Sequence, residues 1–385
     1  MAKMNQHLPD DPIQEAVSEC RRFLKHEIHD KVLEADLQKA TDWVDRIWEK
    51  SRQLDLPFLL LPEDYKGAGF SPYSCAVLLD IIAAECAGIA SVFALHYTGC
   101  IALLSADSRQ QALLFPRLTG AGALRPALIA PVFPSETDGN RFEVEANDHG
   151  LVIHGTTALT GNALTADIFC VFIEDDDDTG EHITCVVLEK GTPGLRTGRP
   201  ADLPGLKVNG FAPIIFDHVM VDHQWIVGTR KKAGALMERS KDGLYRFIAA
   251  MAMGTARSAF EKASAYARQR YQSGKKIVHH QEIQRLLGNM KMKLSIGTAG
   301  YLKSFGDNSN FFRFEAPKPP LAKVFCTDAA LEITMDAIQI HGGYGYMHEY
   351  GLEKIMRDVK VLQLMLGRNP KCQINTIAEE IQHDR

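Results

Sequence analysis

The period of the hydrophobic pattern changes twice along the chain, and the order of these periods limits the fold more than any other feature of the sequence. Apolar residues recur at helical spacing from about residue 13 to residue 118, beginning with Ile13 and Val17. Between about residues 127 and 228 they form short runs and alternating stretches separated by glycine, proline and aspartate, a pattern typical of strands and turns. Helical spacing returns from residue 233. We therefore expect a helical protein with an inserted β-domain.

The length of the chain supports several domains, because 385 residues exceed the ~150 residues of an average domain. The two changes of period predict an N-terminal helical domain over residues 1–125, a middle β-domain over residues 126–232 and a C-terminal helical domain over residues 233–385. The predicted fold class is therefore α+β and multidomain.

Three apolar runs in the middle domain predict strands, at residues 168–173, 183–188 and 214–221. An acidic run at residues 174–178 lies between the first two. Its spacing matches no known calcium-loop or two-metal pattern, and like charges repel one another. We therefore expect a solvated hairpin turn there rather than a cation site.

Composition and missing motifs exclude several classes of function. The net charge of −5 gives no broad basic face for nucleic acid, and no stretch approaches the ~20 apolar residues of a membrane span. The first twelve residues contain no apolar signal core, and the eight cysteines are scattered without a CxxC pair. No Rossmann glycine fingerprint, phosphate loop, HExxH or GxSxG motif is present. We expect a cytoplasmic protein with no nucleic-acid partner, no membrane partner and no metal site.

Four segments, in matching order and spacing, resemble the motifs of one family. The first is PEDYKGAG at residues 62–69, and the second is Gly155 with NA at residues 162–163 and ADIF at residues 166–169. The third is RYQSG at residues 270–274, followed by Gln281. The fourth is QIHGGYG at residues 339–345, followed by Arg357, Asp358 and Gly367. On these residues the chain resembles the FAD-dependent acyl-CoA dehydrogenases over nearly its whole length. Without the resemblance, the glycines of the last segment have two interpretations. They allow the backbone to approach a ligand or a second helix closely, or they form a plain loop between helices.

The resemblance implies a helical N-terminal domain, a middle β-barrel-like domain and a C-terminal four-helix bundle, assembled as a homotetramer or a heterotetramer. It also implies FAD as the cofactor, an acyl-CoA as the substrate and electron-transfer flavoprotein as a partner. In this family a glutamate removes the α-proton of the thioester while the β-hydride passes to the flavin.

Cofactor-binding residues follow from the matching positions. The resemblance implies that Arg270 pairs with the FAD pyrophosphate as a bidentate donor. It also implies that Gln281, Gln339, Gly342 and Gly343 surround the adenine and ribose side of a FAD molecule bound mainly by a neighbouring subunit.

Three further positions match family residues closer to the substrate. Gly367 aligns with the glycine that follows the catalytic glutamate and is expected to contact the cofactor. Arg246 matches an arginine near the CoA chain, and a helix-terminal salt bridge is the alternative role for it. Thr137 aligns with the serine of the family's TEPxxGSD loop and is expected to contact the substrate.

The catalytic glutamate is missing from both positions at which the family carries it. Leu366 occupies the usual position, and Tyr245, just before Arg246, occupies the alternative one. Side chains that face the flavin ring also differ, because Pro131 replaces a threonine and LTG at residues 159–161 replaces WIT. The resemblance therefore identifies a divergent member.

Two side chains are candidates for the missing acid or base. His96 could act as an acid or base near neutral pH, as histidines do, although a packed and hydrogen-bonded histidine is the alternative. Tyr245 is a poor proton acceptor but could donate a proton in the reductive direction, or it could simply fill the pocket as an amphipathic wall.

Two functions are consistent with these substitutions. The first is a flavin-dependent oxidoreductase that acts on the Cα–Cβ bond of an acyl-CoA, by dehydrogenation or by reduction of an enoyl or alicyclic acyl-CoA, with a non-standard acid or base. The second is a non-catalytic subunit of a heteromeric acyl-CoA dehydrogenase, which completes the FAD site of its partner.

Overall fold

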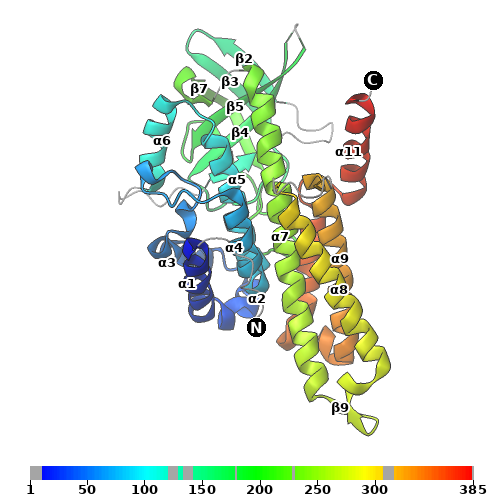
Figure 1. Cartoon of the computed structure of the whole chain (residues 1–385). Coiled ribbons are helices and arrows are strands. Elements are labelled where there is room, and N and C mark those ends of the chain that lie inside the picture. Colours follow the sequence, from blue (N-terminus) through cyan, green and yellow to red (C-terminus); the bar gives the residue numbers. More distant parts are fainter. Residues whose placement is uncertain are drawn as a thin grey trace.

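The computed structural model describes residues 11–119, 129–132, 142–177, 180–227, 230–306 and 316–383. Its elements follow the order helices, strands, helices, as the hydrophobic periods predict (Figure 1). Within these residues, we find no helix that is both long enough and apolar enough to cross a lipid bilayer.

Helices build the described N-terminal region, and α4 and α5 lie at its centre. Ser71 caps α4 by accepting a hydrogen bond from the Ser74 amide. Every residue of α5 is buried, because a helix that is apolar all round needs neighbours on all sides. The bounds are α1 (Asp11–Glu27), α2 (Val32–Gln38), α3 (Thr41–Ser51), α4 (Pro72–Glu85), α5 (Ala87–Leu103) and α6 (Ser108–Thr119).

The middle region contains two four-stranded sheets. One has the strand order β1-β4-β5-β8, and the other has the order β2-β3-β7-β6. The expectation of a barrel-like domain is wrong for the described residues, since their strands form two open sheets rather than a closed one. The bounds are β1 (Ile129–Val132), β2 (Glu143–Asn147), β3 (Gly150–Thr156), β4 (Ile168–Asp177), β5 (Gly180–Glu189), β6 (Leu195–Thr197), β7 (Ile214–Asp222) and β8 (Ile226–Val227).

The three strands predicted from apolar runs are confirmed as parts of β4, β5 and β7. The predicted hairpin is confirmed, because β4 and β5 pair antiparallel. The predicted position of its turn is wrong, since residues 174–177 belong to β4 and pair with β5 out to Asp177 and Gly180. The two residues between them lie outside the described part of the chain.

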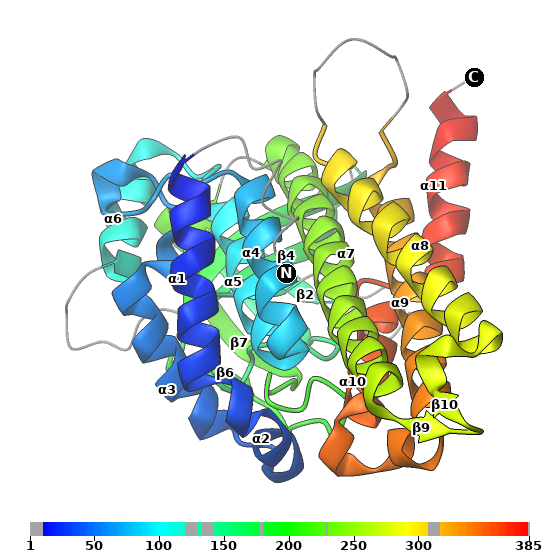
Figure 2. The same cartoon turned by 60° about the horizontal axis from the view of Figure 1, so that its bottom comes forward.

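The C-terminal region is a bundle in which α7, α8, α9 and α10 pack together, with α11 at its edge (Figure 2). Helix α7 has 40 residues and packs against α4 and α5 as well as against α8 and α9, so it joins the two helical regions. The bounds are α7 (Arg230–Gln269), β9 (Tyr271–Gln272), β10 (Lys275–Lys276), α8 (Gln281–Lys303), α9 (Pro319–His341), α10 (Leu352–Leu364) and α11 (Asn369–His383). The predicted domain boundary near residue 125 lies outside the described residues, and the one at 232 stays a prediction.

Asp80 of α4 ties three helices together. It is buried, forms an ion pair with Arg257 of α7, and accepts a hydrogen bond from the Tyr301 hydroxyl of α8 at 2.8 Å. Gly254 allows this close approach, because a Cβ at that position would lie 2.0 Å from the Asp80 backbone oxygen. This junction fixes α7, which carries several candidate site residues, against the N-terminal helices.

Candidate functional site

The two positions expected to match the family's base lie together, although they are 121 residues apart in the chain. Tyr245 lies on α7, and Leu366 lies in the loop between α10 and α11. The Tyr245 hydroxyl donates a hydrogen bond to the Leu366 backbone oxygen at 3.1 Å. The pair thus offers a phenol and an apolar side chain, both partly buried, where the family has a carboxylate.

The backbone of this loop has an unusual conformation. Leu366 has a φ of +52°, in the left-handed region that side chains with a Cβ rarely adopt, and Gly367 has a φ of +93°. A residue with a branched side chain at such a position needs support from its surroundings. We call residues 364–369 the Leu366 loop.

A buried lysine supplies that support. Lys323 of α9 is 0% exposed, and its Nζ donates to the backbone oxygens of Gln363 and Gly367 and to Oδ1 of Asn369, each at 2.8 Å. Burial lowers its pKa to about 8. The sequence analysis missed Lys323, although a lysine flanked by apolar residues within a helical pattern is a signal of a buried, bonded charge.

Asn369 continues this network at the start of α11. Its Nδ2 donates to Oγ1 of Thr327 at 2.9 Å and to Oδ1 of Asp328 at 2.7 Å. The loop is therefore bonded to α9 on one side and to Tyr245 of α7 on the other.

Arg246 follows Tyr245 on α7 and is partly buried. Its Nε donates to the Ser304 backbone oxygen at 2.9 Å, and its guanidinium lies 5.4 Å from the centre of the Phe305 ring. Burial lowers its pKa, while Asp242, one turn earlier, acts in the opposite direction. Burial in turn raises the pKa of Asp242, and Arg246 opposes that shift.

His96 lies in the packed interior of the N-terminal region. It is 1% exposed, and its Nε2 lies 2.8 Å from the Pro57 backbone oxygen. The Trp48 ring meets the imidazole edge-on with 4.8 Å between ring centres. Burial lowers the pKa of His96 to about 4. These contacts favour the packing alternative over a role in proton transfer.

The residues expected to hold the tail of the cofactor lie at the far end of the C-terminal bundle, near β9 at its lower end in Figure 1. Arg270 follows α7, Gln281 begins α8, and Gln339 is in the last turn of α9. All three side chains are exposed. The Arg270 guanidinium lies 5.8 Å from the centre of the ring of Tyr344, which follows α9 directly.

The glycines beside these residues leave open space. Gly342 has a φ of +59°, and a Cβ added at Gly342 or Gly343 would meet no heavy atom within 4 Å. An exposed arginine beside an uncovered glycine turn fits an extended anionic group such as the pyrophosphate of FAD. This end of the bundle therefore fits the tail of the expected cofactor.

The residues at the positions expected to face the flavin ring fit that ring less well than the residues above fit the tail of the cofactor. A Cβ at Gly161 would lie 2.3 Å from the Leu95 side chain and 2.9 Å from Oδ1 of Asn209, so the threonine of the family would require these side chains to shift. The Thr160 amide donates to the backbone of Ala212, and the side chain of Leu159 is half exposed. Because the amide and the hydroxyl of Thr160 are both bonded within the protein, a donor to a flavin from residues 159–161 would have to be another backbone amide of this segment. Thr137 and the side chain of Pro131 lie outside the described structure.

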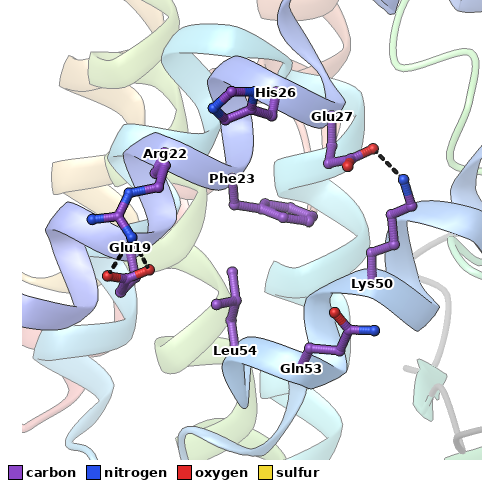
Figure 3. Close-up of a pocket in the computed structure, with 8 residues that line it drawn as sticks. All are labelled: Glu19, Arg22, Phe23, His26, Glu27, Lys50, Gln53 and Leu54. Atoms are coloured by element: carbon purple, nitrogen blue, oxygen red, sulfur yellow. Dashed lines mark hydrogen bonds and ion pairs between the residues drawn. The ribbon is translucent and has the colours of Figure 1, made fainter.

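A surface pocket on the N-terminal helices holds none of these residues. It lies between α1 and α3, has a volume of about 420 Å³, and its ion pairs are drawn in Figure 3. Arg22 pairs with Glu19 at 2.9 Å, and Lys50 pairs with Glu27 at 2.6 Å. Because these charges already satisfy one another, the pocket offers little to an ionic ligand.

Comparisons with known proteins agree with this geometry. The family model "Acyl-CoA dehydrogenase, N-terminal domain" matches residues 11–120, and "Acyl-CoA dehydrogenase, C-terminal domain" matches residues 246–382. The chain is similar to cyclohexane-1-carbonyl-CoA dehydrogenase of Syntrophus aciditrophicus (strain SB), with 26% identity over 382 residues that cover 97% of this chain and 98% of the relative.

Two further similarities are to proteins of Megasphaera elsdenii. Its short-chain specific acyl-CoA dehydrogenase is 30% identical over 265 residues, which cover 68% of this chain and 69% of the relative. The solved structure of its butyryl-CoA dehydrogenase has a TM-score of 0.86 and 26% identity, and the match covers 97% of this chain and 98% of that one. The chain therefore belongs to the acyl-CoA dehydrogenase family, whose members are oxidoreductases that act on CH–CH bonds.

Proposed function

We propose that this protein is a FAD-dependent oxidoreductase that acts on the Cα–Cβ bond of an acyl-CoA thioester with an acid or base other than the usual glutamate. The observation that carries the proposal is the hydrogen bond from Tyr245 to the Leu366 backbone. Two positions that serve as alternative bases must reach the same substrate carbon, so they must lie together. Their contact supports a retained site for the family's reaction with altered proton chemistry.

The proton chemistry that these residues offer favours donation. A neutral phenol such as that of Tyr245 is an O–H donor, whereas Leu366 can neither donate nor accept a proton. Asp242, one helical turn before Tyr245, is a partly buried carboxyl group whose pKa is raised, and it is a second proton carrier on this helix. We therefore favour reduction of an enoyl or alicyclic acyl-CoA over ordinary dehydrogenation.

Arg246 is proposed to orient the substrate. Its guanidinium is held by Ser304 and Phe305, which fixes a positive charge one residue from Tyr245. Such a charge suits the phosphates of a CoA chain. Leu366 adds an apolar surface that keeps water away from the reacting carbons.

FAD, when bound, supplies the two-electron exchange of this reaction. Arg270, Gln281, Gln339 and the two glycines are proposed to hold its pyrophosphate and adenine end. Gln339 and Lys323 are 16 residues apart on α9, so this end lies about 24 Å along the helix from the Leu366 loop. That separation supports a homotetramer or heterotetramer in which these residues serve a flavin bound mainly by a neighbouring subunit, with electron-transfer flavoprotein as a partner.

The residues expected to face the flavin ring favour a second function, that of a non-catalytic partner subunit. A side chain at Gly161 would require its neighbours to shift, and neither expected base position holds a carboxylate. A chain with these losses could complete the FAD site of an active partner without turning over substrate itself. The two functions differ in whether this chain binds flavin and reacts when it is alone.

Purification of the chain alone, followed by its visible spectrum and flavin content, distinguishes them. The enzyme proposal predicts close to one flavin per chain, and bleaching or reoxidation of that flavin by members of a panel of straight-chain, enoyl and alicyclic acyl-CoAs. A colourless oligomer that gains flavin only with a second subunit would support the partner function and overturn the enzyme.

A variant pair tests the tail site separately. Arg270→Met should lower the flavin content, because it removes the charge proposed to pair with the pyrophosphate, whereas Arg268→Met removes an exposed charge two residues away and should not. Equal flavin content in both variants would contradict the assignment of Arg270.

A further inference from the structure

The sheet β2-β3-β7-β6 contains an irregularity that brings three potential metal ligands together. The antiparallel pairing of β3 with β7 is interrupted between Ile153 and Gly155. His154 therefore faces two residues of β7, Asp217 and His218, where a regular ladder would offer one. This two-against-one arrangement is a β-bulge, a feature that re-aims side chains.

The bulge changes which face of the sheet these side chains share. In a regular strand, neighbouring residues such as Asp217 and His218 point to opposite faces. Here both are exposed, as is His154. The ligand atoms of all three residues lie within 4.8 Å of one another.

Distances within the cluster are close to those of a metal site. Asp217 Oδ1 lies 3.1 Å from Nδ1 of His218 and 3.9 Å from Nδ1 of His154. The two imidazole rings have centres 4.7 Å apart. Ligand atoms 2.0–2.2 Å from a tetrahedral zinc ion are ~3.3 Å apart, so a small adjustment of side chains would close the site.

The backbone at His218 is part of the same bulge. Its φ is +51°, in the left-handed region where glycine is the favoured residue. A left-handed residue is an element of one class of β-bulge, so this conformation accounts for the local change in side-chain direction.

We propose that His154, Asp217 and His218 form a binding site for a divalent transition-metal ion, with Zn²⁺ as the reference ion. Two imidazoles and one carboxylate are ligands that zinc accepts, and three protein ligands leave a further position for water. The site is on the middle sheet, at the top of Figure 1, whereas Tyr245 and Leu366 belong to the C-terminal helices. Its role is therefore separate from the proposed redox chemistry, and the metal would fix β3 to β7 at the bulge.

One neighbouring charge acts against cation binding. Arg196 of β6 is a positive charge near Asp217. Its guanidinium competes with a metal ion for the Asp217 carboxylate. Removing Arg196 should therefore tighten metal binding.

The test is a titration of the chelator-treated full chain with Zn²⁺, followed by calorimetry, and with Co²⁺, followed by visible absorption. We expect one ion per chain bound at this site. His154→Ala and His218→Gly should each weaken binding at least tenfold, whereas His223→Ala, an exposed histidine beyond the end of β7, should not. The glycine variant suits the left-handed backbone, so its loss of binding would reflect the ligand rather than misfolding.

Three outcomes would overturn the site. Zn²⁺ binding that is unchanged in His218→Gly would remove the ligand assignment. An equal loss in His223→Ala would indicate binding to scattered surface histidines. A Co²⁺ spectrum typical of a fully hydrated ion in the unmodified chain would exclude coordination by imidazole.

Discussion

Replacement of Lys323 by methionine should destabilise the Leu366 loop more than any other single change at the candidate site. Methionine keeps most of the length and apolar volume of the lysine stem but removes all three donors. Gln363 O, Gly367 O and Asn369 Oδ1 would then lose partners that are now 2.8 Å away.

The expected loss in the free energy of unfolding follows from two opposing contributions. A hydrogen bond to a charged group contributes ~1.5–3 kcal/mol, and a buried acceptor left without a partner costs ~1–3 kcal/mol. The substitution also relieves the cost of burying the ammonium group of Lys323, which is several kcal/mol. Removal of one partner from a buried charged network typically costs ~3–5 kcal/mol, and we expect a loss of about this size.

The assay has a global and a local part. Chemical denaturation measures the free energy of unfolding, and hydrogen exchange of the amides in the Leu366 loop measures local opening. Lys360→Met is the matched control, because Lys360 is exposed and donates a hydrogen bond to the side chain of Gln363 at 2.9 Å. It should change stability by less than ~0.5 kcal/mol. If Lys323→Met destabilised the protein no more than Lys360→Met, or left the loop amides fully protected, the anchoring role of Lys323 would be refuted.

Three further predictions test the base position, the buried histidine and the helix junction. Leu366→Glu should give the flavin-loaded protein measurable dye-linked acyl-CoA dehydrogenation, and a folded, flavin-loaded variant without any gain would contradict the alignment of that loop. Burial holds the pKa of His96 at about 4, below the ~6.5 of an unfolded chain, so the unfolded state binds more protons between these two pH values. The free energy of unfolding should therefore fall by up to ~3 kcal/mol as the pH drops from 6.5 to 4. Over that range, the denaturation midpoints of the wild type and of His96→Asn should converge. Gly254→Ala should lower the free energy of unfolding by ~2–3 kcal/mol, because its Cβ would meet the Asp80 backbone oxygen at 2.0 Å. Gly288 is a helical glycine with open space around it, so Gly288→Ala should stabilise the protein by ~0.5–1 kcal/mol. Thermal unfolding of both variants measures the difference.

Elements with a strong period could be predicted from the sequence. The runs that became β4, β5 and β7 are confirmed, because a buried strand must be apolar wherever it crosses the core. The family could also be predicted, since its motifs are local in sequence. The division of the described strands into two open sheets could not be predicted, because it depends on how the outer strands pair, and hydrophobic alternation within a strand does not contain that information.

The parts of the site that the sequence did not reveal depend on contacts between distant segments. Lys323 bonds residues 40 to 46 positions later in the chain, and no local pattern marks such partners. His218 and Asp217 are neighbours that strict alternation assigns to opposite faces, so only the interrupted register of the two strands reveals that they meet His154.

The substitutions in this chain are unevenly distributed over the fold, and this distribution bears on the choice between the two functions. By the resemblance, the expected family residues are kept at the far end of α9, where Arg270 and Gln339 are exposed, and are replaced near its beginning, where Tyr245 meets Leu366. General decay of an unused site would leave both ends altered and the loop loosely held. Instead, three hydrogen bonds from a fully buried Lys323 hold the altered loop in a strained backbone conformation. Because such strain persists only where the surrounding structure maintains it, the altered loop is firmly held, which favours a changed reaction over a lost one.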